Sequence, residues 1–303
     1  MMSLNTAFKK VYGETLESYG FKKVKGKHPY FARVIGEEIV HVITCAPESA
    51  NPGREDIENG YMVYGGIATV YRPRINFDDK PRDNRNWYTR DLGVHLVLEM
   101  TDEDDLPDDI RNSPIYEAYL KLKENKCPRD RFQELYVFSY MKNNEESLLV
   151  SLKNALEVTK QYMLPLFETI NDLRTCMVYF KHFRGDLFIY SDDNFGKKNS
   201  GYEYNEGFLN YLFYTAEEYK NMKIKGCENS DRKLLERIAS GEIKMTMEGF
   251  EKHKKHGDEI VNKQIATFTK YMEQKEEHIK LMNEMERRKK KNKDLLRDYG
   301  FDI

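Results

Sequence analysis

The densest group of potential metal ligands is an acidic run that follows a segment with strand character. Six of the eight residues from Asp102 to Asp109 are acidic. Carboxylate oxygens grouped in this way are the ligands that Mg²⁺ and Ca²⁺ prefer. The run therefore indicates a metal-dependent hydrolase or nuclease with four candidate ligands, Asp102, Asp104, Asp105 and Asp108. Because the spacing is not that of an EF-hand loop, a solvated acidic loop, or a patch for a basic partner, is the favoured alternative.

A second charged group, near the end of the chain, is basic and could contact the phosphates of a nucleic acid. It consists of Arg287, Arg288, Lys289, Lys290, Lys291 and Lys293. Each phosphate contact releases a counterion, so binding through this run would be strongest at low salt. However, residues 251–303 hold 14 basic and 11 acidic residues, a net charge of only +3. Cations also stabilise the C-terminal end of a helix through its dipole, and we favour that structural role.

A loop predicted between residues 72 and 90 mixes arginine with aromatic residues and holds the only tryptophan of the chain, Trp87. Arg, Trp and Tyr are enriched among the residues that dominate the energy of protein–protein binding, and loops carry function more often than cores do. A lid role, in which Trp87 folds back over the sheet, is equally compatible with the sequence. We take this loop as the preferred binding site, with candidate contacts Arg72, Arg74, Arg82, Arg85, Trp87, Tyr88 and Arg90.

The remaining nucleophiles and metal ligands lack the spacing that a site requires. The four cysteines are at least 49 residues apart, at Cys45, Cys127, Cys176 and Cys227, so we expect buried thiols rather than a disulfide framework or a zinc finger. His253 and His256 share a helix face, but the three lysines around them favour a solvated helix end. No P-loop, Rossmann glycine pattern or Gly-x-Ser-x-Gly motif occurs. We therefore expect no cofactor.

The composition excludes several further classes of protein. The 303 residues include 49 basic and 51 acidic ones, and a net charge of −2 gives no overall electrostatic case for a nucleic-acid-binding protein. The 21 Tyr and 16 Phe supply too much aromatic surface for an intrinsically disordered chain. The N-terminus lacks the apolar stretch of a signal peptide, and no apolar run approaches the roughly 18 residues that span a bilayer. We expect a soluble, cytoplasmic protein.

The spacing of apolar residues predicts strands in the first third of the chain and helices after it. Ser3 to Gly20 predicts a capped helix. Strands are predicted at residues 30–35, 39–44, 61–71 and 92–100. The first two form a hairpin across Gly36-Glu37-Glu38, and Gly65-Gly66 marks a bulge or bend in the third.

From Ser113 onward the pattern is mostly helical. Helices are predicted at residues 144–163, 166–180, 208–222 and 258–297, with Pro165 bending or ending the first of these. The last is the longest. Its apolar residues follow nearly a coiled-coil spacing for about three heptads, broken at Lys275.

Several short motifs together resemble an uncharacterised bacterial protein family. They are Phe8-Lys9-Lys10, Gly20-Phe21-Lys22-Lys23, Tyr30-Phe31-Ala32-Arg33, Val40-His41-Val42-Ile43, and Leu164-Pro165-Leu166-Phe167 with Leu173. The resemblance covers roughly residues 4–180 and implies a helix that leads into an Arg-bearing aromatic strand and a curled antiparallel sheet. The chain departs from the family in the Arg72–Arg90 loop and beyond about residue 185. The family it resembles has no established activity.

These observations predict an α+β fold in which an N-terminal helix packs on an antiparallel sheet of about four strands. An α+β domain at 1–185 is followed by a mainly helical region at 186–303 that packs on it and ends in a long helix. We expect a non-enzymatic protein-binding module, of the immunity or defence-related kind that the resemblance implies. The alternatives are the metal-dependent enzyme and the nucleic-acid-binding protein described above. The expected partner is another protein. The alternatives are nucleic acid and a second copy of the chain that pairs through the final helix. We expect no membrane association.

Overall fold

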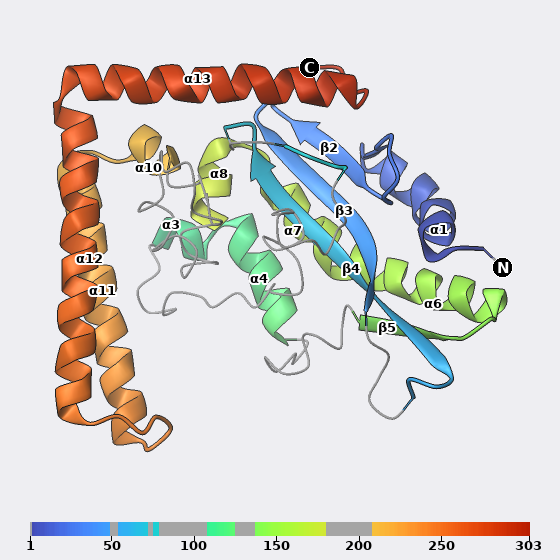
Figure 1. Cartoon of the computed structure of the whole chain (residues 1–303), viewed down its shortest axis with the longest axis horizontal. Helices are drawn as coiled ribbons and strands as arrows, with labels where there is room; N and C mark the ends of the chain where they lie inside the picture. Colours follow the sequence, from blue (N-terminus) through green and yellow to red (C-terminus); the bar gives the residue numbers. More distant parts are fainter. Residues whose placement is uncertain (1, 49–53, 72–74, 79–107, 125–136, 180–207) are drawn as a thin grey trace.

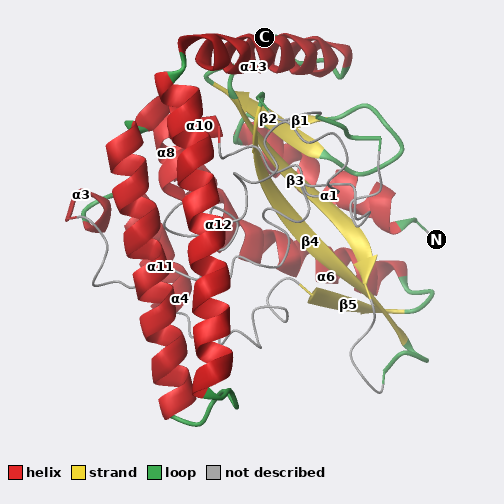
Figure 2. Cartoon of the chain, turned by 60° about the vertical axis from the view of Figure 1, so that its left-hand side comes forward, coloured by secondary structure: helices red, strands yellow, loops and turns green. Residues whose placement is uncertain are grey.

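The computed structural model describes residues 2–48, 54–71, 75–78, 108–124, 137–179 and 208–303 (Figure 1). In these residues an antiparallel sheet and its covering helices form one part of the molecule. Three long helices, α11 (Ala216–Ala239), α12 (Met247–Glu273) and α13 (Lys275–Asp298), frame it on two sides (Figures 1 and 2). The predicted α+β class, with an N-terminal helix, an antiparallel sheet and a helical C-terminal part, is confirmed.

The first helix, α1 (Leu4–Ser18), begins and ends at residues suited to its caps. Ser3 Oγ accepts a hydrogen bond from the backbone N–H of Thr6 at 3.3 Å, which satisfies one of the free donors at a helix start. Gly20, just past the helix, has a φ of +79°, a conformation that glycine adopts without strain. The helix packs on the sheet through Phe8, whose ring centroid lies 6.0 Å from that of Phe31.

The sheet has the order β1-β2-β3-β4-β5, and all neighbouring strands are antiparallel. Its strands are β1 (Lys22–Lys23), β2 (Phe31–Ile35), β3 (Ile39–Glu48), β4 (Glu58–Thr69) and β5 (Val137–Met141). The predicted hairpin is β2–β3, and the third predicted strand is β4. The fourth, at 92–100, lies outside the described residues. The edge strand β5 was not predicted, because its five residues fall in a region assigned to helices.

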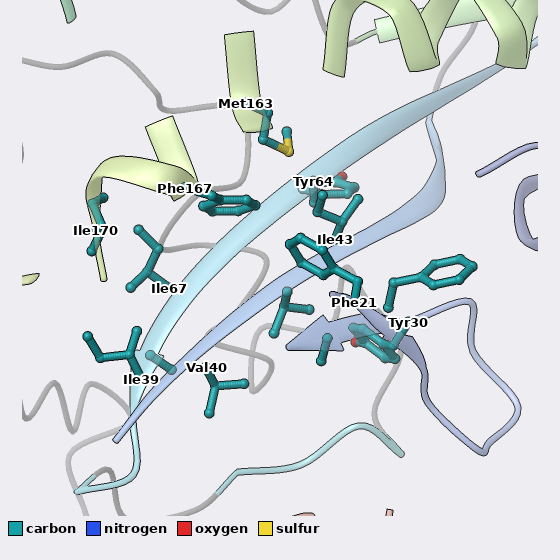
Figure 3. Packing of buried hydrophobic residues seen from close by; sticks show 14 of the residues in the cluster. Phe21, Tyr30, Ile39, Val40, Ile43, Tyr64, Ile67, Met163, Phe167 and Ile170 are labelled. Atoms are coloured by element: carbon teal, nitrogen blue, oxygen red, sulfur yellow. The ribbon is translucent and has the colours of Figure 1, made fainter. Parts of the chain in front are cut away.

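Two helices and the π-helical turn between them cover the same face of the sheet as α1. They are α6 (Glu145–Val158), the turn Thr159–Met163 and α7 (Leu164–Thr169). Tyr61 of β4 shares a hydrogen bond of 3.0 Å with Ser151 of α6. Phe167 of α7 and Ile170, the residue after α7, lie beside Ile67 of β4 (Figure 3).

The π-helical turn explains how the chain passes Pro165 without stopping. A proline inside a helix lacks the N–H donor, and its ring collides with the carbonyl four residues earlier. Just before the proline, Leu164 donates its N–H to the carbonyl of Thr159, five residues back, which widens the helix. Helical structure therefore continues through Pro165 into α7, so the helix predicted at 144–163 does not end at the proline.

Gly65 lies where this helical segment approaches β4 most closely. The pairing of β3 with β4 continues through Gly65 and Gly66, opposite Ile43 and Val42, so there is no bulge. A Cβ atom on Gly65 would lie 2.7 Å from Met163 Sδ and 3.1 Å from the tip of the Phe167 ring. The glycine is thus required by packing between helix and strand.

We expect Gly65→Ala to lower the free energy of unfolding by about 1–3 kcal/mol, because the methyl group must displace Met163 and Phe167 in a packed core. The matched control is Gly13→Ala in α1, where no atom lies within 4 Å of the added Cβ. Alanine there should raise stability by about 0.5–1 kcal/mol through helix propensity. Urea unfolding of the two variants measures both effects, and equal changes would contradict the close approach at Gly65.

Several segments of the second half of the chain that were predicted as single helices are divided into shorter helices in the structure. The remaining described helices are α3 (Asp108–Arg111), α4 (Pro114–Glu124), α8 (Leu173–Val178) and α10 (Phe208–Phe213). The helix predicted at 208–222 is wrong as a single unit, since α11 restarts at Thr215. There the Thr215 side chain accepts from the Glu218 N–H, and the Glu218 side chain accepts from the Thr215 N–H, a capping box.

The long helix predicted at 258–297 is also two helices. Gln274 has extended backbone angles, with φ −89° and ψ 101°, and the chain turns a corner there between α12 and α13 (Figure 1). The sequence predicted one continuous helix here, and the interruption of its apolar spacing at Lys275 lies one residue past this corner. After the corner, α13 runs across one end of the sheet, where the Asn292 side chain bonds to the backbone of Val70 and Ile75.

Candidate functional site

Most of the sequence-predicted binding and metal residues cannot be placed. The segment with Arg72, Arg74, Arg82, Arg85, Trp87, Tyr88 and Arg90 lies outside the described residues, as do Asp102, Asp104 and Asp105. Asp108 is the exposed first residue of the short helix α3. The boundary predicted at 185/186 also falls outside the described residues. The predicted binding loop, the predicted acidic metal site and the predicted domain boundary therefore stay predictions.

The basic run of α13 is described in full, and part of it binds the β2–β3 hairpin. Lys289 Nζ lies 2.9 Å from Glu38 Oε1, and Lys293 Nζ lies 2.6 Å from Glu37 Oε2. Tyr71 also donates its hydroxyl to Glu38. Both acidic partners follow Gly36 in the hairpin turn, so the two lysines hold α13 to one end of the sheet.

Two arginines of the run pair within the helix. Arg287 and Arg288 both donate to Glu284, at 2.7 and 2.8 Å. The hydrogen bond from Arg287 is the first cause that lowers the pKa of Glu284 to about 2. Of the six predicted phosphate contacts, four thus take part in ion pairs inside the chain, and Lys290 and Lys291 are exposed. This arrangement gives the run a role in docking the helix.

Residues from four of the motifs behind the family resemblance meet in one buried cluster. The Arg33 guanidinium lies 4.8 Å from the centroid of the Phe21 ring, and the rings of His41 and Phe167 stack with centroids 4.8 Å apart. The ring centroids of Phe21 and Phe167 lie 5.9 Å apart, which connects the two pairs. The motifs therefore join the turn that follows α1 to β2, β3 and α7 around a common centre.

Polar contacts tie this cluster together. Arg33 donates from Nε to His41 Nδ1 at 3.1 Å and from Nη1 to the Tyr19 carbonyl at 2.9 Å, and pairs with Glu168 at 2.5 Å. Burial, and then the charge of Arg33, lower the pKa of His41 to about 3. His41 is fully buried and Arg33 is 7% exposed, so the cluster has the properties of a structural centre rather than of an open site.

Helices α11 and α12, with the turn between them, form an antiparallel pair that we call the helical arm (Figure 2). Near α13 its two helices pack through aromatic rings. Tyr211 of α10 and Tyr219 of α11 stack on Phe268 of α12, with centroids 4.6 and 3.9 Å apart. Away from these rings, α11 contributes Lys223 as a further buried residue, and α12 contributes Phe250, Val261 and Gln264. The arm is thus packed through stacked rings at its base and through fewer side chains, mainly from α12, beyond it.

Large apolar side chains are exposed on the arm. Ile224 and Leu235 of α11 are 39% and 37% exposed, and Met247 at the start of α12 is 57% exposed. Ile224 and Leu235 are eleven residues apart, about three helical turns, so they lie on the same side of α11. A helix side with spaced apolar residues among charges is typical of a surface that binds another protein.

A group of potential metal ligands lies between the two helices of the arm. Cys227 and Asp231 of α11 and Asp258 of α12 each place a ligand atom within 4.8 Å of the others. Cys45 and Cys176 are buried, as predicted. Cys227 is only half-buried, so the prediction of a buried thiol is confirmed there only in part. His253 and His256 are exposed on α12, as predicted for a solvated helix face.

Sequence reasoning missed this group. The four-residue spacing of Cys227 and Asp231 was a usable signal, since it places both on one face of a helix. Asp258 is 27 residues further on, and only the hairpin arrangement of α11 and α12 brings it near.

Comparisons with known proteins do not assign the chain to a family. A scan against protein-family models finds no match. Neither the curated proteins nor the solved structures give a significant match. In the part of the chain that the structure describes, no helix has the length and apolarity needed to cross a bilayer. Any proposed function therefore rests on the chain's own residues and their arrangement.

Proposed function

We propose that the protein is a non-enzymatic binding protein whose helical arm docks another protein. The observation that carries the proposal is the set of exposed aliphatic side chains on the arm, Ile224 and Leu235 on one side of α11 and Met247 at the start of α12. Each of these residues is between 37% and 57% exposed, so burying the remaining surface against a partner contributes roughly half of the 1.5–3 kcal/mol of a fully exposed side chain, about 1 kcal/mol each. The partner is a protein with an apolar patch, of a size that two or three aliphatic side chains fill, surrounded by charged groups.

The charges around these residues suit an interface rather than a membrane surface. Lys225 and Glu228 follow Ile224, and Glu236 and Arg237 follow Leu235, all of them exposed. An apolar centre with a polar rim of both signs is the usual composition of a protein–protein interface. A surface that binds anionic lipid would instead carry mainly Lys and Arg.

The proposal predicts that Leu235→Glu combined with Met247→Glu abolishes partner binding. Truncation or charge at the centre of an interface costs about 2 kcal/mol or more, which corresponds to about a thirtyfold loss of affinity. The measurement is affinity purification from the native host with quantitative mass spectrometry, followed by titration with the protein that co-purifies. Val150→Glu is the matched control, because Val150 is 52% exposed but lies on α6.

The two outcomes of this comparison are distinct. Loss of a stoichiometric partner in the arm variant, with retention in Val150→Glu, supports the docking surface. If the wild type, the arm variant and Val150→Glu all retain the partner equally, the arm is not the docking surface. Binding would then have to reside elsewhere, and Trp87→Ala tests the predicted 72–90 site directly. A partner that is a toxin would support the predicted immunity or defence role.

A further inference from the structure

The side of α11 that faces α12 is polar where a helix pair is normally apolar. Tyr219, Lys223, Cys227 and Asp231 follow one another on α11 at intervals of four residues, which keeps them on one side of the helix. Tyr219 packs on Phe268 of α12, Cys227 bonds to Asp258, and Asp231 pairs with Lys254. Helix pairs depend on apolar residues at such positions, so a thiol and a carboxylate there require another source of stabilisation.

The three donor atoms lie at distances that a small cation can bridge. Cys227 donates its thiol to Asp258 Oδ1 at 3.5 Å, and all three ligand atoms lie within 4.8 Å of one another. Tetrahedral zinc, with bonds of about 2.0–2.3 Å, separates its ligands by roughly 3.3–3.8 Å. One pair already has this separation, and side-chain rotation closes the others. A Cβ on Gly257 would lie 3.8 Å from the Cys227 sulfur, an ordinary contact distance, so this part of α12 lies directly beside the thiol.

The Asp231 carboxylate already has a cation beside it in the structure. The Lys254 ammonium is 3.9 Å from Asp231 Oδ2, and its side chain is 47% exposed, so it can move into solvent when a metal enters.

We propose that Cys227, Asp231 and Asp258 bind one Zn²⁺ ion that cross-links α11 to α12. One thiolate and two carboxylates form a ligand set for zinc, because the thiolate disfavours Mg²⁺ and Ca²⁺. On binding, the Cys227 thiol releases its proton to solvent and the sulfur bonds to the metal. Water or His253 fills the fourth position. The ion stabilises the part of the arm beyond its base and does not depend on any partner.

The test uses the full-length protein, freed of metal with a chelator and then titrated with Zn²⁺, Co²⁺ or Cd²⁺. We expect one equivalent to bind and the melting temperature to rise by about 2 °C or more with excess zinc. Cobalt and cadmium should each give a thiolate-to-metal charge-transfer band. Cys227→Ser should lose this band and the zinc-dependent rise in melting temperature. Asp231→Asn and Asp258→Asn should weaken zinc binding at least about tenfold.

Two controls separate this site from other thiols and from loss of folding. Cys127→Ser, at a cysteine outside the described residues, and Glu228→Gln, at the exposed residue next to Cys227, should both bind metal as the wild type does. Far-UV circular dichroism shows whether Cys227→Ser keeps its helices, and Asp258→Asn supplies the same test if it does not. A band that persists in Cys227→Ser, or zinc titrations that change neither absorbance nor melting temperature, would overturn the proposal. If His253→Ala weakens zinc binding, His253 is the fourth ligand, and if zinc binding is unchanged, water fills that position.

Discussion

Asn292→Leu is expected to lower the free energy of unfolding by about 2–5 kcal/mol. The Asn292 side chain is fully buried in α13. Its Oδ1 accepts from the N–H of Ile75 at 2.9 Å, and its Nδ2 donates to the carbonyl of Val70 at 2.8 Å. Leucine has a similar volume but bonds to neither group. Each buried polar group left without a partner costs about 1–3 kcal/mol, and Val70 and Ile75 are themselves fully buried.

Two further variants separate the hydrogen bonds of Asn292 from its packing. Lys291→Leu changes the exposed neighbour and should stay within about 0.5 kcal/mol of the wild type in urea unfolding. Asn292→Asp keeps the acceptor for Ile75 but loses the donor to Val70. At neutral pH it should be as unstable as the leucine variant, and it should recover relative to the wild type as acid protonates its carboxyl group. If Asn292→Leu unfolds like the wild type, this side chain does not hold α13 to the sheet.

The parts of the fold that could be predicted from the sequence depend on local signals. The N-cap at Ser3 and the positive φ of Gly20 act within a few residues, and so they mark the ends of α1. The β2–β3 hairpin likewise connects two adjacent runs of β-branched and aromatic residues. In each case the residue types that define the element also supply its stabilising contacts.

The elements that were missed depend on distant contacts or on signals that apolar spacing hides. β5 is a strand because it pairs with β4 and packs near α6, neither of which is visible in five residues. The corner at Gln274 has no glycine or proline to mark it. The division at Thr215 did have a signal, the Thr215–Glu218 capping box, but aromatic residues on both sides of it favoured a single helix there.

The basic run shows why charge alone does not identify a site. Lys289 and Lys293 reach acidic partners in a turn about 250 positions earlier, at Glu38 and Glu37. The sequence contains both groups of charges but not their proximity. The same holds for the arm, where the spacing of Cys227 and Asp231 is local and the third ligand, Asp258, depends on how α11 and α12 pack.

Acid is expected to destabilise the protein through His41 before most carboxylates titrate. In the folded protein the pKa of His41 is about 3, because burial and then the Arg33 charge disfavour the protonated ring, and the nearby Ile170 carbonyl opposes them only weakly. In the unfolded chain a histidine has a pKa of about 6.5. Between these values the unfolded state binds the additional proton. Stability is therefore complete above about pH 6.5 and falls toward pH 3 by up to about 1.4 kcal/mol per unit.

His41→Asn isolates this effect, because the asparagine Oδ1 can replace Nδ1 as the acceptor for Arg33 Nε but does not titrate. Its free energy of unfolding should start lower, since a buried ring has been removed, and should change less between pH 6.5 and 5 than that of the wild type. Urea unfolding at several pH values measures both slopes. In the native wild type, one imidazole C2–H resonance should keep its neutral chemical shift down to about pH 4.5. Parallel slopes, or a titration of all histidines near pH 6.5, would show that His41 is not held neutral by the buried cluster with Arg33, Phe21 and Phe167.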